Sequence, residues 1–263
     1  MKVSVNHLMD SGRSLFLAYD HGLEHGPADF NEANVDPEYI LDIAVKGHYN
    51  AVILQKGIAE RYYEHYRQKV PLIVKVNGKT RIAKNPPYSP ITCSVKRAVE
   101  LGAEGIGFTV YDGSPLEPKV FTDFRKIQEE AHDFGIPVIA WMYPRGKFVA
   151  NDTSIDTLAY AARVGLELGA DILKMKFNPD IPGYKWVIKC AGNVPVVCAG
   201  SSKLPDNELL QRTAGMVEAG ASGMAIGRNV WQHHNPLGLT RALKKIIFEG
   251  KKPDAALKMI SKK

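Results

Sequence analysis

The sequence predicts a single-domain α/β protein with the fold of a closed (β/α)8 barrel, the TIM barrel. Short apolar runs alternate eight times with segments of helical period, a pattern typical of βα units around a parallel sheet. Four of the runs follow a glycine, as in "ELGAEGIGF" and "EAGASGMAIG", where a helix C-cap and a short loop belong. The length of 263 residues, without a low-complexity linker, suits one barrel. An open doubly wound sheet is the alternative, because a sequence does not display closure.

Eight strands are predicted from these runs, which are bounded by turn-forming residues. In chain order they are "SLFLAYD" (14–20), "NAVILQ" (50–55), "PLIVKV" (71–76), "EGIGFTV" (104–110), "PVIAWMY" (137–143), "ADILKMK" (170–176), "PVVCAG" (195–200) and "SGMAIG" (222–227).

Amphipathic helices are expected between the strands, most clearly at 153–168 and 206–219. Asp206 is expected to cap the second of these at its N-terminus. The last residues, about 250–263, indicate a C-terminal helical extension that either caps the barrel or meets another subunit. We therefore expect one domain over residues 1–263.

Composition narrows the class of protein. The chain is 45% hydrophobic and 24% charged, as ordinary globular proteins are, and no run reaches eighteen apolar residues, so no membrane span is expected. The start "MKVSVNHLMD" has no secretory pattern, and Cys93, Cys190 and Cys198 form no disulfide or zinc motif, so we expect a cytoplasmic protein. The formal charge is +6, but the basic residues are spread and no nucleic-acid motif accompanies them. The surplus suits a small anionic substrate such as a sugar phosphate.

Two glycine-containing loops predict a phosphate site. In this fold the active site lies at the carboxyl ends of the strands, and the loops after the last two strands usually hold phosphate. The seventh predicted strand ends at Gly200, before Ser201 and Ser202, and the eighth ends at Gly227, before Arg228. Exposed backbone N–H groups and a bidentate guanidinium suit phosphate oxygens, so all five residues are candidates for substrate binding.

The sixth predicted strand carries two lysines on one face. Lys174 and Lys176 are two residues apart, so both point the same way, with Lys174 inside the barrel and Lys176 nearer the mouth. A buried amine near another cation can lose its proton and attack a carbonyl, which predicts Schiff-base chemistry. The alternative is a lysine paired with a carboxylate such as Asp20. Lys56 and Lys75 are rival strand-end amines that spacing does not exclude.

Three other polar or aromatic residues at strand ends are candidates. Tyr143 ends the strand next to the lysines, and its phenol could pass a proton to or from a substrate hydroxyl. Asp20 follows an apolar strand and could orient or deprotonate a sugar hydroxyl. Trp141 lies on the same face as Tyr143, where it either contacts substrate or packs.

The segment "HGLEH" (21–25) matches a zinc-peptidase pattern but is not expected to bind metal. That pattern needs a helix to bring its two histidines onto one face, and here Gly22 and Gly26 follow directly on a strand. His21 and His25 are expected to belong to a substrate-binding loop instead.

Five segments together resemble a known family. "LAYDHGLEHGPADF", "VKVNGKT", "WMYPRG", "GADILKMKF" and "AIGRNVWQ" are similar, in order and separation, to the archaeal-type class I fructose-1,6-bisphosphate aldolases of the DhnA family, over about residues 12 to 247. The resemblance implies a metal-independent TIM barrel without a cofactor, often a decamer of two pentamers. It implies Lys174 as the imine-forming residue, Tyr143 as general acid/base and Asp20 as the carboxylate at the cleaved bond. The C1 phosphate would lie against Gly200, Ser201, Gly227 and Arg228.

The implied reaction is reversible cleavage of fructose 1,6-bisphosphate to dihydroxyacetone phosphate and glyceraldehyde 3-phosphate, a lyase step of glycolysis and gluconeogenesis. Relatives commonly have Gly-Gly-Pro-Lys after the seventh strand, whereas this chain has "GSSK", so Ser201 stands where a glycine is usual. The alternatives are a family paralogue doing transaldol or thiolase-type chemistry on another phosphorylated ketose, a non-catalytic phosphosugar-binding barrel and a zinc-dependent aldolase.

Overall fold

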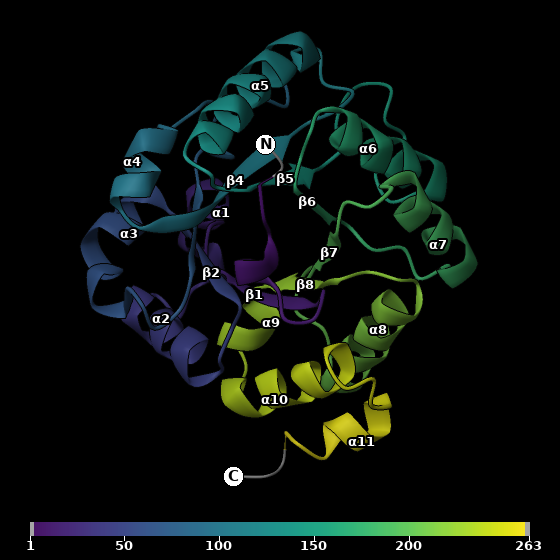
Figure 1. Cartoon of the computed structure of the whole chain (residues 1–263). Coiled ribbons are helices and arrows are strands. Elements are labelled where there is room, and N and C mark those ends of the chain that lie inside the picture. The colour runs from purple at the N-terminus through teal and green to yellow at the C-terminus, as the bar shows by residue number, and fades with distance from the viewer. Residues whose placement is uncertain (1–2, 261–263) are drawn as a thin grey trace.

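Eight parallel strands close into a barrel in the computed structural model, which describes residues 3–260 (Figure 1). Each strand pairs with the next, and the first pairs with the last in the register Ser14↔Gly223. The predicted closed barrel is confirmed, and the open-sheet alternative is wrong. All eight strands lie within two residues of their predicted bounds: β1 Ser14–Ala18, β2 Ala51–Gln55, β3 Leu72–Lys75, β4 Ala103–Val110, β5 Val138–Met142, β6 Ile172–Met175, β7 Val196–Ala199 and β8 Gly223–Ile226.

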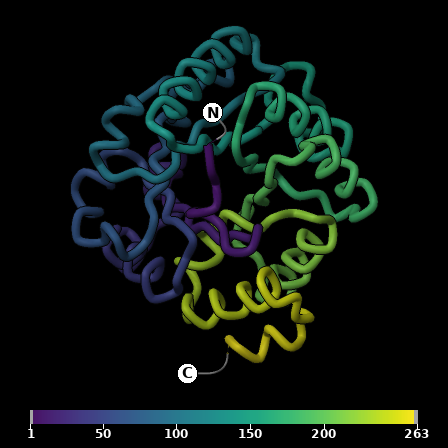
Figure 2. Tube along the Cα trace, viewed as in Figure 1, coloured from purple at the N-terminus to yellow at the C-terminus, as the bar shows by residue number. Residues whose placement is uncertain are grey.

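Helices surround the barrel as an outer ring (Figures 1 and 2). The α-helices are α1 Gly22–His25, α2 Pro37–Lys46, α3 Lys56–Tyr62, α4 Val95–Glu100, α5 Glu117–Asp133, α6 Ile155–Glu167, α7 Ile181–Cys190, α8 Asp206–Glu218, α9 Arg228–Trp231, α10 Pro236–Ile247 and α11 Pro253–Leu257. Short 3-10 helices lie at Asn6–Leu8, Gly26–Asp29 and Glu64–Tyr66.

Alternation along the strands builds two apolar layers. In β1, Phe16 and Ala18 point into the barrel, whereas Leu15 and Leu17 pack against the helices. The barrel interior also contains Leu8, which is fully buried. Leu8 belongs to the N-terminal segment that crosses the front of the barrel in Figure 2, so this side chain closes one end. The open end is therefore at the carboxyl ends of the strands.

One helix start differs from the sequence-based expectation. The N-cap of α8 is Pro205, and Asp206 is the first helical residue and makes no side-chain cap. Its carboxylate instead contacts Nε2 of His233 at 3.1 Å, because that partner lies within reach after folding. The predicted C-terminal extension is a short helix, α11, packed against α8 and α10 on the outside of the ring rather than over the barrel; residues 261–263 lie outside the described chain.

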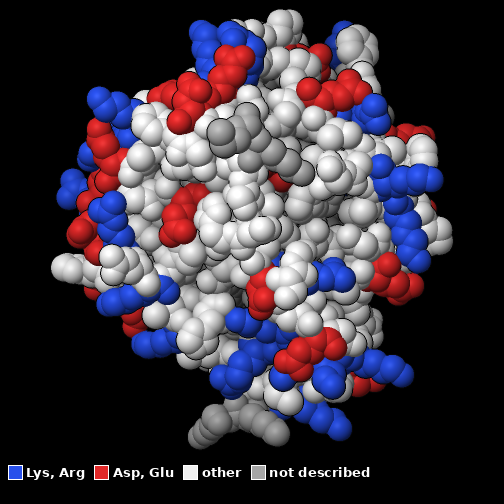
Figure 3. Space-filling view, viewed as in Figure 1, with Lys and Arg blue, Asp and Glu red and all other residues white. Residues whose placement is uncertain are grey.

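The surface carries charge without a single-sign patch on the face seen in Figure 3. Basic and acidic residues alternate over the outer helices, and the centre of that face is largely uncharged. Among residues 3–260, no helix has the length and apolar character that crossing a bilayer requires.

Candidate active site

A cavity of about 440 Å³ opens at the carboxyl ends of the strands. It lies where the predicted site residues converge, because inward-facing positions of all the strands and the loops that follow them meet at this end. All twelve predicted site residues line it: Asp20, His21, His25, Trp141, Tyr143, Lys174, Lys176, Gly200, Ser201, Ser202, Gly227 and Arg228.

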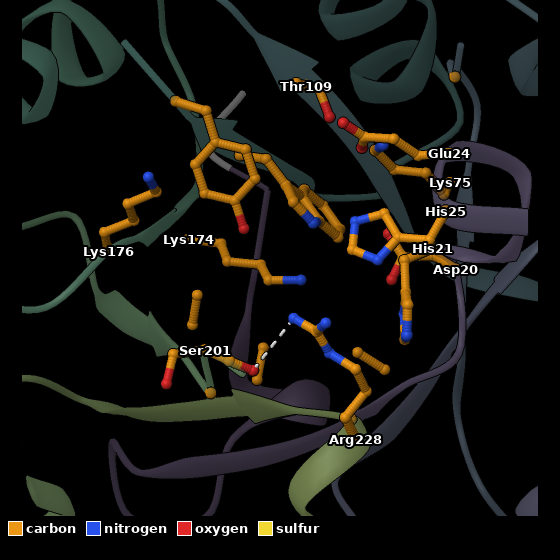
Figure 4. A pocket seen from close by; sticks show the side chains of 18 of the residues that line it. Asp20, His21, Glu24, His25, Lys75, Thr109, Lys174, Lys176, Ser201 and Arg228 are labelled. Atoms are coloured by element: carbon orange, nitrogen blue, oxygen red, sulfur yellow. Dashed lines mark hydrogen bonds between the residues drawn. The ribbon is translucent and has the colours of Figure 1, made fainter. Parts of the chain in front are cut away.

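Lys174 reaches the centre of this cavity (Figure 4). It follows the inward-facing Ile172 on β6 and is 5% exposed. Its amine lies 4.6 Å from the centroid of the Trp141 ring, and among residues 3–260 it donates no hydrogen bond and joins no ion pair. Burial lowers the pKa of Lys174 to about 8; Asp20 opposes this shift and Lys75 adds to it. About a tenth of the amine is therefore neutral at pH 7, far more than in an ordinary lysine.

Lys176 has a different environment. It follows the last residue of β6, is about one-third exposed, and forms an ion pair with Asp152 from the loop before α6. In Figure 4 its amine points away from that of Lys174. The order predicted for the two lysines, one inside and one at the mouth, is confirmed, but the cation that acts on the inner amine is Lys75.

The two rival amines are separated by the structure. Lys75 ends β3 on the inward face, is 6% exposed and donates a hydrogen bond to the carbonyl oxygen of Asn77 at 3.2 Å. Lys56 begins α3 and does not line the cavity. The alternation of side chains along a strand, here called strand parity, accounts for the difference. Ile73 points into the barrel, so Lys75, two residues later, points inward as well. On β2 the inward position is Gln55, so its neighbour Lys56 points elsewhere.

Asp20 and Tyr143 can act as a base and an acid, respectively, because the carboxylate is ionised and the phenol is protonated. Burial by itself raises the pKa of Asp20, but the cations of Lys174 and Lys75 outweigh it, so the pKa lies below its ordinary value and the carboxylate stays ionised. Burial, with the charges of Asp20 and Glu24, raises the pKa of Tyr143 well above its ordinary value, so the phenol keeps its proton. The cavity thus holds a proton acceptor and a proton donor.

The "HGLEH" segment does form one helical turn, α1, so the expectation that its glycines prevent a helix is wrong. The histidines nevertheless have other partners. Arg81 donates to Nε2 of His25 at 3.0 Å, so Nδ1 of His25 donates to Asp29 at 2.8 Å. Burial lowers the pKa of His21 to about 4, which keeps this ring neutral, and it stacks on Trp231. No cluster of three metal-binding side chains occurs in residues 3–260.

The two predicted phosphate loops lie against each other. Nη2 of Arg228 donates to the carbonyl oxygen of Ser201 at 3.4 Å, the dashed contact in Figure 4. Nδ2 of Asn229 donates to the carbonyl oxygens of Gly200 at 2.7 Å and Ser202 at 2.9 Å. The other guanidinium nitrogen, Nη1 of Arg228, is 3.4 Å from both carboxylate oxygens of Asp29. Arg228 is thus held at the cavity by a carboxylate that a bound phosphate would replace or share.

Gly227 is required by a close approach of backbone. A Cβ at this position would lie 2.6 Å from the carbonyl oxygen of Ala18, far inside normal contact distance, and 3.2 Å from the indole nitrogen of Trp231. That nitrogen donates to the same carbonyl at 3.2 Å. The start of α9 therefore packs directly on the end of β1, which places Arg228 at the cavity.

Ser201 occupies a left-handed backbone conformation, with φ of 54°. This region costs a non-glycine residue on the order of 1 kcal/mol. We expect Ser201→Gly to raise the thermal midpoint of unfolding by about 1–3 °C, because the relief of strain exceeds the entropy lost by a glycine. Ser202→Gly, at a position without positive φ, is the matched control and should lower the midpoint. A lower midpoint for Ser201→Gly would show that the loop is not strained there.

Several cationic residues of the cavity were not predicted. Arg145 lies within the segment "WMYPRG", two residues after the predicted strand ends, so its place in sequence could have indicated it. Its Nη1 is 3.3 Å from Oε1 of Glu24. Arg212 comes from the middle of α8, donates to the carbonyl oxygen of Phe177 at 3.0 Å, and has no sequence signal. Besides Lys75, which the sequence offered as a rival amine, the cavity is lined by cations that were not predicted: Lys79, Arg81, Arg145 and Arg212.

Known aldolases are similar to this chain in sequence and in structure. Residues 14–233 match the family described as DeoC/LacD family aldolase. A Thermoproteus tenax protein named fructose-bisphosphate aldolase class 1 is 47% identical over 244 residues, 92% of each chain. The crystal structure of an archaeal fructose 1,6-bisphosphate aldolase has 45% identity and a TM-score of 0.88, covering 94% of this chain and 97% of that one. An archaeal aldolase with its catalytic Lys covalently bound to the carbinolamine intermediate of the substrate has 44% identity and a TM-score of 0.87, covering 93% and 96%.

Proposed function

This chain belongs to the DeoC/LacD family of aldolases, and from that premise we propose that it is a class I fructose-1,6-bisphosphate aldolase that acts through a Schiff base. The observation that carries the proposal is the buried, unpaired amine of Lys174 at the centre of the cavity, with its pKa lowered to about 8. A neutral amine is the nucleophile that imine formation with a ketone requires.

The covalent steps follow from the position of Lys174. Its nitrogen attacks the C2 carbonyl of the open-chain ketose, and the carbinolamine loses water to give a protonated imine. The positive charge on this nitrogen withdraws electrons from the C3–C4 bond. No metal ion is needed for this electron withdrawal, because the iminium supplies the positive charge.

Asp20 and Tyr143 divide the proton transfers according to their protonation states. The carboxylate of Asp20 accepts the proton of the C4 hydroxyl as the C3–C4 bond breaks, which releases glyceraldehyde 3-phosphate and leaves an enamine on Lys174. The phenol of Tyr143 then gives its proton to C3. Water hydrolyses the resulting imine, dihydroxyacetone phosphate leaves and the amine is free again. The proton that Asp20 accepted returns through water to the phenolate of Tyr143, so both groups end as they began.

Positive charge at two places suits a substrate with a phosphate at each end. Backbone of Gly200, Ser201 and Gly227, with the guanidinium of Arg228, would bind the C1 phosphate beside the imine. Farther out, Lys79 and Arg145 lie against the ring of Tyr111 and would meet the phosphate at C6.

Reductive trapping tests this proposal. Dihydroxyacetone phosphate with cyanoborohydride should attach a stable adduct to Lys174, located by mass spectrometry of the digested protein. Since only the neutral amine forms the imine, the trapping rate should fall about tenfold for each pH unit below the pKa of about 8. An adduct on another lysine, or none, would overturn the assignment of Lys174.

We also propose that the enzyme works as a homo-oligomer in the cytoplasm, a decamer of two pentamers as in similar aldolases. The cysteines Cys93, Cys190 and Cys198 are free thiols, which accords with a reducing compartment. Tyr160 on α6 and Trp186 on the adjacent α7 are 72% and 54% exposed, and such aromatic surface suits contact with another subunit. The mass in solution, measured by light scattering, tests the subunit number.

A further inference from the structure

Two buried amines lie against one indole ring in the barrel. The amine of Lys174 is 4.6 Å and that of Lys75 is 5.3 Å from the centroid of the Trp141 ring. The ring has space there because β4 has a glycine: a Cβ on Gly107 would lie 2.3 Å from the indole and 3.3 Å from Cδ of Lys75. The arrangement brings both amines into the same water-poor interior as Asp20.

The surroundings of the two amines favour a charge on Lys75. Burial lowers the pKa of Lys75 as well, but the carboxylates of Asp20 and Glu24 both oppose this shift. Lys75 also donates to the carbonyl oxygen of Asn77, and Glu24 lies beside it in Figure 4. Lys174 has no hydrogen-bond partner in the described chain and faces Asp20 together with the cation Lys75. An ammonium group is better stabilised where an acceptor and two anions surround it.

The acceptor of Lys75 is held rigidly. Nδ2 of Asn77 donates to the carbonyl oxygens of Ser89 at 3.2 Å and Thr109 at 3.0 Å, and its Oδ1 accepts from the backbone nitrogen of Thr109 at 2.8 Å. Asn77 is completely buried. The backbone carbonyl of Asn77 is therefore already in position to accept a hydrogen bond from Lys75. Holding it there costs no further conformational entropy when the amine is charged.

Charged or titratable side chains from several elements line the cavity that holds Lys174. Asp20 and Lys75 are the groups whose charge acts most on its amine. Those lining the same cavity are Asp20, His21, Glu24 and His25 after β1, Lys75, Lys79 and Arg81 on or after β3, Tyr143 and Arg145 after β5, Lys176 after β6, Arg212 on α8 and Arg228 after β8.

We infer that Lys75 holds a positive charge that this part of the barrel stabilises, and that this charge, beside the same indole ring, favours the neutral, nucleophilic form of Lys174 over its ammonium form. The inference deepens the proposed function, on which its catalytic meaning rests. Lys75 is a positioning residue: it acts through the proton balance of Lys174 and forms no bond to substrate. Two ammonium groups close together repel each other in a medium of low polarity. Of the two carboxylates that act on Lys75, Asp20 and Glu24, only Asp20 also acts on Lys174.

Competitive acetylation tests the inference without substrate. The protein is treated with trace acetic anhydride between pH 6 and 10, and each lysine is quantified by mass spectrometry after denaturation and complete labelling. In the unaltered protein, Lys174 should titrate near pH 8 and Lys75 at a higher pH. This measurement needs no variant, so it does not depend on whether a substitution is tolerated.

Variants then separate charge from shape. Lys75→Met removes the charge from a side chain of similar length, and the labelling midpoint of Lys174 should rise by at least one pH unit, with labelling at pH 7 falling about tenfold. Lys75→Arg keeps the charge and should keep the midpoint low. Lys56→Met, outside the cavity, is the matched control and should leave the midpoint unchanged.

Two results would overturn the inference: a midpoint of Lys174 unchanged in Lys75→Met, or a Lys75 that titrates below Lys174 in the unaltered protein. Failure of the proposed function gives a different result. In that case no imine is trapped with dihydroxyacetone phosphate, although acetylation still shows the expected order of the two midpoints.

Discussion

Lys174→Met is expected to lower kcat for the cleavage of fructose 1,6-bisphosphate by roughly 10⁴-fold or more, because no covalent electron sink can form without the amine. The variant removes a buried polar group and replaces it with a flexible apolar side chain of similar length. The phosphate loops around Gly200 and Arg228 do not depend on this side chain, since their contacts are with each other and with Asn229 and Asp29. Binding of a phosphorylated ligand should therefore persist.

The measurement is steady-state cleavage coupled to detection of glyceraldehyde 3-phosphate, with ligand binding measured by calorimetry. Lys176→Met is the matched control, since that lysine lies on the same strand face but is partly exposed and paired with Asp152. Its loss should cost less than about tenfold, as expected for a partly solvated ion pair. If Lys174→Met kept more than a hundredth of the activity and the trapped adduct moved to Lys75, the assignment of the nucleophile would be wrong.

Tyr143→Phe should lower kcat by about 10²–10⁴-fold, the usual contribution of a positioned general acid or base. Only the hydroxyl is lost, and the ring continues to pack against the inner apolar layer. Burial and nearby carboxylates raise the pKa of this phenol, so in the native enzyme it is a proton donor at neutral pH. The affinity for dihydroxyacetone phosphate should change less than threefold, because one hydroxyl contributes little to uniform binding.

Turnover and ligand affinity must be measured on the same preparation, because the prediction concerns their separation. Exchange of the C3 proton of dihydroxyacetone phosphate with deuterium, followed by NMR, isolates the step assigned to Tyr143. Exchange at the native rate in Tyr143→Phe would remove the phenol from that step. Equal losses in affinity and turnover would indicate a role in binding instead.

The fold was predictable because its signals are local. Each strand is a short apolar run, and helix ends such as Gly102 and Gly220 have the positive φ that favours glycine. Closure of the barrel was inferred from the number of units rather than from any single residue. The N-cap of α8 was mispredicted because Asp206 found a distant partner, His233, and a local rule cannot include such a contact.

The site was predictable to the extent that strand parity decides it. Parity places Lys174 inside, and it would also have separated Lys75 from Lys56 if applied to β2 and β3. The ion pairs that orient the charged side chains of the site could not be predicted, because they join segments that are remote in sequence. Examples are Lys176 with Asp152 and Arg228 with Asp29, the latter 199 residues apart.

Leu8 is buried inside the amino-terminal end of the barrel and closes that end, so the cavity opens at the carboxyl ends of the strands. A ketose tethered at its inner carbon can release only the outer fragment until the tether is hydrolysed. In the condensing direction the ketone must form its imine with Lys174 before its enamine can attack the aldehyde. The closed inner end leaves the mouth of the cavity as the way in for the second triose, so the proposed chemistry predicts an ordered reaction with the ketone bound first.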